Sequence, residues 1–114
     1  MLEIREDSFT TLDRDFRRRY HEEIYGYLAQ RIPDTITPRP KADVMLEIEA
    51  SHRRANERGI ESSDDIVRFT TLWMIAGRNF DNQPAVDEYL ASTDWSMTKK
   101  LDRLLREVGT KLDH

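Results

Sequence analysis

Glu49 and His52 are spaced as two metal ligands on one helix face would be. A Glu-x-x-His pair at i and i+3 is the pattern by which di-iron carboxylate bundles project ligands inward. Such a site also needs a second pair and two further carboxylates, yet the other internal histidine, His21, follows Arg18 by three residues. The paired histidines of zinc proteases, four residues apart, are missing too. We therefore expect no metal site and no cofactor, and interpret His52 as a half-buried helix residue.

Two carboxylate pairs, Asp64-Asp65 and Asp87-Glu88, could act as general acid and base if a pocket shifted their pKa values. Both pairs stand in the first turns of expected helices, where the helix dipole already explains a negative charge. No nucleophile, base and orienting group fall into a recognised pattern. The chain is predicted to have no catalytic residues and not to be an enzyme.

Arginines cluster in two expected helices, at Arg14, Arg17, Arg18, Arg19, Arg53, Arg54 and Arg58. One basic surface would be the footprint of a nucleic-acid protein. Acidic residues interleave with these arginines and the net charge is −4, which favours ion pairs instead. A helix-turn-helix around Gly59 stays open as an alternative, although its second helix would begin Ser63-Asp64-Asp65 and repel DNA. Nucleic acid is not the expected partner.

The stretch "MIAGRNFDNQP", residues 74–84, reads either as an oxygen-rich calcium loop or as a corner between two helices. The glycine and glutamate of an EF-hand loop are absent from their positions, so calcium is not expected. The corner has a reason for each residue: Gly77 ends a helix, Phe80 packs on the core, Asp81 or Asn82 caps, and Pro84 opens the next helix. The stretch therefore predicts a structural corner with a buried Phe80.

Helical periodicity predicts the elements that position these residues. A long helix is expected from about Glu6 to Ile32, with its core stripe at Phe9, Leu12, Phe16, Tyr20, Ile24, Tyr27 and Leu28. Gly26 within it would mark a close helix crossing. Three prolines predict an extended, helix-free connector over residues 33–40.

Four further helices are expected after the connector. The first begins at Lys41 and ends before Gly59, with Ile60 folding back, and the next begins at Ser63 behind a Ser62 cap and is the most buried. A short helix follows Pro84 behind Asn82 or Gln83, and the last begins near Trp95 or Ser96. The fold class is thus all-α, a single compact bundle of about five helices.

Length and composition agree with one helical domain over residues 1–114. Charged residues make up 35% and hydrophobic residues 38% of the 114 residues, and there is no cysteine. No apolar run is long enough to cross a bilayer and no leader is recognisable, so the expected location is the cytoplasm. Residues 61–95 carry 2 Lys+Arg against 7 Asp+Glu and form an acidic segment.

Residues 59–84, "GIESSDDIVRFTTLWMIAGRNFDNQP", and residues 99–105, "KKLDRLL", resemble a family of small helical bacterial proteins. Their genes tend to lie beside type VI secretion spike, adaptor and toxin genes, and their helix corner shares the glycine, phenylalanine and aspartate seen here at Gly77, Phe80 and Asp81. No catalytic residue is carried over from the resemblance. The resemblance implies an accessory chaperone or adaptor partner that helps load a toxin, or alternatively an immunity protein that neutralises one.

Such a role needs exposed residues that contact another protein. Tyrosine and tryptophan dominate interface hot spots, and Tyr25 lies off the expected core stripe. An acidic face could steer a basic partner. The expected contact residues are Tyr25, Asp81, Asp87, Glu88, Asp94 and Trp95.

Overall fold

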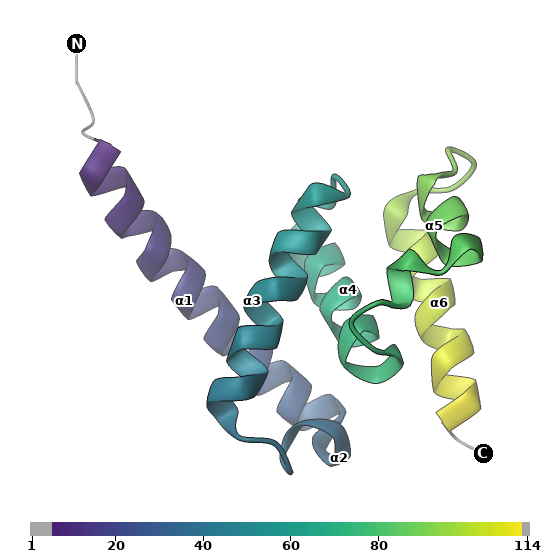
Figure 1. The fold of residues 1–114 in the computed structure, drawn as a ribbon, viewed down its shortest axis with the longest axis horizontal. Coiled ribbons are helices and arrows are strands. Elements are labelled where there is room, and N and C mark those ends of the chain that lie inside the picture. The colour runs from purple at the N-terminus through teal and green to yellow at the C-terminus, as the bar shows by residue number, and fades with distance from the viewer. Residues whose placement is uncertain (1–5, 113–114) are drawn as a thin grey trace. The chain divides into compact units, whose positions relative to one another are not determined.

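Every regular element in the described part of the chain is a helix, as the computed structural model in Figure 1 shows. The structure describes the backbone of residues 6–112 and the side chains of residues 14–108. The elements are α1 (Glu6–Arg31), α2 (Pro33–Ile36), α3 (Lys41–Glu57), α4 (Ser63–Ala76), the 3-10 turn η1 (Phe80–Asn82), α5 (Pro84–Ala91) and α6 (Met97–Leu112). The predicted all-α class is confirmed.

The chain divides into two compact units, Met1–Met45 and Leu46–His114, so that α3 begins in one unit and continues in the other. The expectation of a single domain over residues 1–114 stays a prediction. Each unit is described below by itself.

The first unit consists of α1, α2 and the start of α3. Its buried apolar side chains include Ile24 and Leu28 of α1, Ile36 of α2 and Val44 of α3. The prediction of an extended connector over residues 33–40 is wrong, because Pro33 opens the short helix α2, which packs against α1. Proline suits the first helical position, where its missing N–H would have no partner in any case.

The predicted core stripe of α1 is correct only in part. Phe16 is 72% exposed and Tyr27 is 42% exposed, so neither belongs to the core. The Tyr27 hydroxyl instead accepts a hydrogen bond of 3.2 Å from Arg31. Helix α2, which packs against α1, has only four residues. The predicted stripe positions Phe9 and Leu12 lie outside the described side chains.

Gly26 does not mark a close helix crossing. A Cβ atom added there would meet no heavy atom within 4 Å, and the residue is exposed. The glycine therefore weakens α1 without gaining a contact.

Helices α3 and α4 meet at a turn that local sequence predicts correctly. Gly59 has a φ of 80°, and the Ile60 N–H donates to the Ala55 carbonyl at 2.9 Å, which is the hydrogen bond of a Schellman cap. The Ser62 hydroxyl then accepts from the Asp65 N–H at 3.2 Å and caps α4. Behind this turn, the buried hydroxyls of Ser51 and Thr70 hydrogen-bond at 2.8 Å.

Helix α4 provides more of the core of the second unit than any other element and packs against α6 and η1. The prediction that this helix is the most buried is confirmed by its buried residues, which are Asp65, Ile66, Phe69, Thr70, Leu72, Trp73 and Met74. From the other elements, Ile48, Ile60, Leu90 and Leu101 are also buried.

The corner between α4 and α5 has the predicted geometry. Gly77 follows the last residue of α4 with φ 105° and ψ 154°, a region open essentially to glycine alone. Phe80 is buried, and its ring centroid lies 5.1 Å from that of Phe69. Pro84 opens α5 behind Gln83, which occupies the N-cap position. The roles of Gly77, Phe80 and Pro84 as structural corner residues are confirmed.

Replacing Gly77 by alanine should lower the free energy of unfolding by about 1–3 kcal/mol, because alanine is strained at this φ and ψ. Urea denaturation followed by circular dichroism measures the change. Gly26→Ala is the matched control and should raise stability by about 0.5–1 kcal/mol, because Gly26 is helical, exposed and surrounded by open space. Equal effects of the two substitutions would contradict the account of the corner.

Phe80→Ala should cost about 3–5 kcal/mol of unfolding free energy, because it removes a buried ring that contacts Phe69. Phe80→Leu should cost less, since it refills part of the volume. Both are read from denaturation midpoints. A Phe80→Ala protein as stable as the wild type would mean that the ring carries no core packing.

Candidate functional site

The Asp81 carboxylate lies at the centre of an ion-pair network in the second unit. Its Oδ2 atom accepts from the Nε atoms of Arg54 at 2.7 Å and Arg58 at 2.6 Å. Arg58 also donates from Nη2 to the Asp81 carbonyl at 2.6 Å and from Nη1 to Asp87 at 2.9 Å. Arg54 reaches the Asn82 side chain at 2.6 Å. Two arginines of α3 and its cap thereby hold η1 and the first turn of α5.

Two predictions for Asp81 need correction. Its side chain is 0% exposed, so the prediction that it contacts a partner protein is wrong. It does not cap α5 either, because Gln83 is the N-cap residue and makes no side-chain cap hydrogen bond. Asp81 belongs to the structural corner for a different reason: it is the buried anion that pairs with Arg54 of α3 and with Arg58 just after α3.

Burial by itself raises the pKa of the Asp81 carboxyl, since it disfavours the charged form. Hydrogen bonds from Arg58 and Arg54, and the positive charges of both groups, outweigh that effect. The pKa of Asp81 therefore lies below its ordinary value. The carboxylate is ionised at neutral pH, and its pairing contributes to stability.

Tyr25, another expected contact, is half-buried in the first unit. Its ring lies 5.2 Å from the Lys41 ammonium, which itself pairs with Glu22 at 3.0 Å. The ring thus has a neighbour within the chain and presents only part of its surface to solvent.

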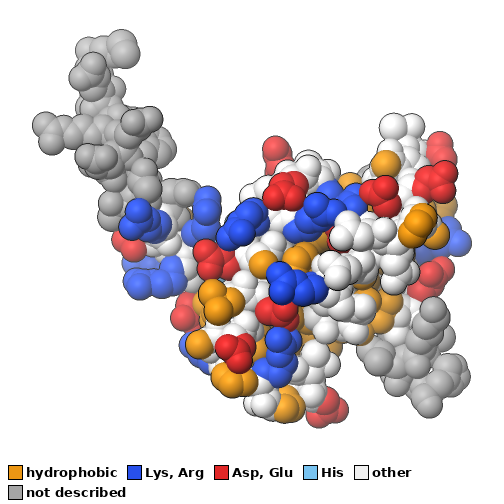
Figure 2. All heavy atoms as spheres, viewed as in Figure 1, with side chains coloured by type: hydrophobic (Ala, Val, Ile, Leu, Met, Phe, Trp, Pro, Cys, Tyr) orange, Lys and Arg blue, Asp and Glu red, His pale blue; other side chains and the backbone are white. Residues whose placement is uncertain are grey.

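The remaining expected contacts, Asp87, Glu88, Asp94 and Trp95, are all exposed residues of α5 and the loop that follows it. Asp87 pairs with Arg58. Figure 2 shows acidic and basic side chains interspersed over the visible face, rather than in blocks of one sign. Of these four residues, Trp95 is the one that the structure places beside a hollow in the surface.

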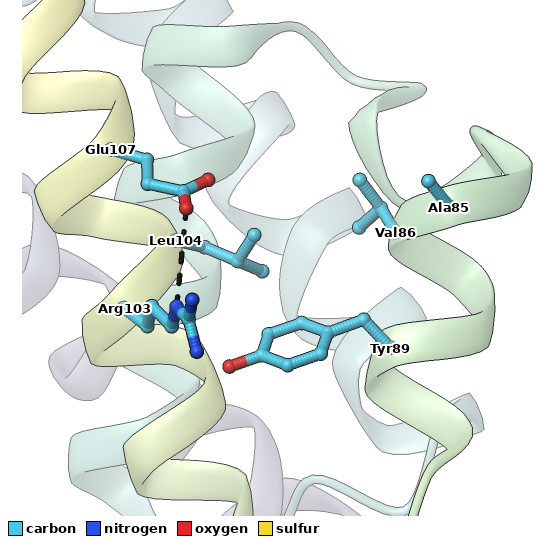
Figure 3. A pocket seen from close by; sticks show the side chains of 6 residues that line it. All are labelled: Ala85, Val86, Tyr89, Arg103, Leu104 and Glu107. Atoms are coloured by element: carbon cyan, nitrogen blue, oxygen red, sulfur yellow. Dashed lines mark ion pairs between the residues drawn. The ribbon is translucent and has the colours of Figure 1, made fainter.

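A hollow of about 450 Å³ lies between α5 and α6. Its wall combines apolar and charged residues, namely Ala85, Val86, Tyr89, Arg103, Leu104 and Glu107. Val86 and Tyr89 point from α5 towards Leu104 and Arg103 on α6, and Arg103 lies 3.9 Å from Glu107 (Figure 3). This is an open groove with an apolar floor and a charged edge.

A second hollow, of about 340 Å³, shares Arg103 with the first and is lined by Trp95, Lys99 and Arg106 as well. The Arg103 guanidinium lies 5.1 Å from the Trp95 ring centroid. The Tyr89 and Trp95 rings meet edge to face, with centroids 6.4 Å apart. Tyr89, Trp95 and Arg103 therefore form one cluster, here called the aromatic–arginine cluster, beside which both hollows open.

Lys100 ties the end of α5 to α6, which sequence reasoning missed. Its side chain is buried, and Nζ donates to the Leu90 carbonyl at 2.9 Å and also to the Ser92 carbonyl. These carbonyls lie at the C-terminal end of α5, where helix carbonyls lack partners. The residues around Lys100 in the sequence do not indicate that its side chain is buried against the end of α5.

Among the described residues, no three His, Cys, Asp or Glu side chains come together as a metal site would require. Glu49 is exposed, and His52 is half-buried as predicted. In the same part of the chain, no helix combines the length and the apolar character needed to cross a bilayer.

No protein-family model, curated protein or solved structure matches this chain.

Replacing Asp81 by asparagine should lower the free energy of unfolding by about 3–5 kcal/mol at neutral pH, because it leaves two partly buried arginines without their anion. Asp87→Asn is the matched control. Asp87 is 58% exposed, so its loss should cost about 0–1 kcal/mol. Urea denaturation compares the two variants.

The pH dependence gives a second readout of the same substitution. Because the folded pKa of Asp81 is lowered, its contribution is complete above the unfolded pKa of about 3.9 and is lost as pH falls through the lower folded pKa. Wild-type stability should therefore fall more steeply than that of Asp81→Asn below about pH 4. Parallel profiles would contradict the assignment of the buried anion.

Proposed function

We propose that the chain is a non-catalytic protein-binding factor, and that it binds through the surface around the aromatic–arginine cluster. One observation carries the proposal: Tyr89, Trp95 and Arg103 are of the three residue types most enriched in interface hot spots, and they stand together between two hollows. Trp95 is 43% exposed. A large aromatic side chain left partly in water beside a groove is a suitable anchor for a partner.

The resemblance of residues 59–84 and 99–105 to small helical bacterial proteins suggests which cellular process this binding serves. It supports an accessory chaperone or adaptor partner of type VI secretion that helps load a toxin effector in the bacterial cytoplasm. A loading factor needs an apolar face that holds a segment of its client. The groove between α5 and α6, with Val86 and Leu104 across it, has that character.

An immunity protein is the alternative, and one observation favours it. Asp87, Glu88 and Asp94 are exposed on α5 and the following loop. Carboxylates there could cover the basic active site of a toxin. The two roles would use different residues. An immunity protein would bind through the exposed carboxylates, and a loading factor would bind through the groove and its basic edge.

Affinity capture of the tagged chain from its native cell, followed by mass spectrometry, tests the proposal. A secretion spike, adaptor or toxin should co-purify in stoichiometric amount. Recovery of DNA alone, or of no stoichiometric protein, would contradict it.

Expression of the chain together with a captured toxin separates the two roles. Under the loading role, the chain does not protect the cell, and its deletion lowers secretion of the toxin. Protection that is lost when Asp87, Glu88 and Asp94 are replaced by asparagine or glutamine would establish the immunity role instead.

A further inference from the structure

We infer that the occupant of the α5/α6 groove is an acidic, amphipathic segment of the partner protein. Its apolar side chains would enter the first hollow, and its carboxylates would meet the cations around the second. The inference rests on the proposed protein-binding function and specifies the chemistry of the partner.

The first hollow, between α5 and α6, presents apolar side chains to a partner. The side chains of Ala85, Val86 and Leu104 are purely hydrocarbon, and they project from two helices that face each other (Figure 3). A groove between two helices receives the apolar face of a third, through side chains spaced three and four residues apart. A nucleic acid has no aliphatic side chain to place there.

Helix α6 presents positive charge at the second hollow. Lys99, Arg103 and Arg106 recur at intervals of three or four residues and line the second hollow beside Trp95. Glu107 is the one carboxylate among the described residues that line either hollow, and it already pairs with Arg103. The local charge is thus positive although the chain as a whole has a net charge of −4. Complementarity of charge selects an acidic partner at this edge.

The Tyr89 hydroxyl is not part of the exposed surface of the groove. Its oxygen is buried and has no hydrogen-bond partner among the described residues, although a buried hydroxyl usually has one. Figure 3 shows this hydroxyl pointing towards α6 at Arg103. Because this oxygen has almost no accessible surface, the hydroxyl is not a contact for a segment lying in the groove.

A labelled helical peptide tests the inference directly. The probe is about five turns long, with leucines three and four residues apart and glutamates elsewhere. Three competitors accompany it: the same peptide with lysine for glutamate, a scrambled peptide of equal composition, and a single-stranded DNA of similar length. Fluorescence anisotropy at low salt should show saturable binding of the acidic amphipathic peptide only, and added salt should weaken that binding.

Variants locate the binding surface. Arg103→Glu should weaken the acidic peptide at least about tenfold and shift preference towards the lysine peptide, a reversal that misfolding cannot produce. Trp95→Ala should also weaken binding about tenfold through loss of the anchor. Arg53→Glu is the matched control, because Arg53 is an exposed arginine of α3 that lines neither hollow, and it should leave affinity within about twofold.

Several results would overturn the inference. They are the absence of saturable binding, equal binding of the scrambled peptide, no effect of Arg103→Glu, and displacement of the peptide by the DNA at lower concentration. The last result would assign the surface to nucleic acid.

Repeating the cellular capture with Arg103→Glu distinguishes this inference from the function beneath it. If the wild type and the variant retain the same partner equally, protein binding stands and the groove is wrong. If the wild type retains no partner, the proposed function itself fails. Two results together would support both the proposed function and the inference about the groove. The wild type, but not Arg103→Glu, would retain an identified partner, and cross-linking would map the contact to an acidic segment of that partner.

Discussion

The second unit depends on the ion pairs that the buried Asp81 carboxylate makes with two arginines. A buried anion is costly unless cations and hydrogen bonds surround it, and here Arg54 and Arg58 provide both. These arginines belong to α3 and its cap, while Asp81 belongs to η1. The network therefore fixes the position of η1, the segment that follows α4, against the end of α3. Arg58 extends it to Asp87 and so to the first turn of α5.

The groove is built outward from that network. Gly77 turns the chain out of α4, Phe80 anchors the turn on Phe69, and Pro84 begins α5. The opposite wall is α6, which is fastened to α4 separately. Thr98 donates to Asp65 at 2.7 Å, and Arg68 donates to Asp102 at 2.8 Å. Both walls are therefore held on the same buried helix, and a partner would meet a largely pre-formed surface.

Sequence reasoning succeeded where a structural rule involves neighbouring residues. The Ser62 cap, the Gly59 turn and the Gly77 corner each follow from residues a few positions apart. It failed where the partner lies far along the chain: Arg54 and Asp81 are 27 residues apart, and nothing local marks Asp81 as buried. The four-residue spacing of Arg54 and Arg58 on one helix face was the available signal.

The long first helix and the last one show two further limits. Periodicity placed Ile24 and Leu28 correctly in the core. Phe16 and Tyr27 belong to the same predicted stripe but are exposed. Trp95 was recognised by residue type alone. Its neighbours Tyr89 and Arg103 could not be grouped with it without the crossing of α5 and α6. The sequence therefore anticipated the fold class and the corner more fully than the groove.

Lys99 and Lys100 are adjacent in sequence but differ in their accessibility to solvent, because Lys99 is exposed and Lys100 is buried. Lys99 lines the second hollow, whereas the ammonium of Lys100 lies against the carbonyls that end α5. An amine-reactive reagent applied to the folded chain should acylate the first and spare the second. Modification of Lys100 would then report separation of α5 from α6, and protection of Lys99 would report occupancy of the second hollow.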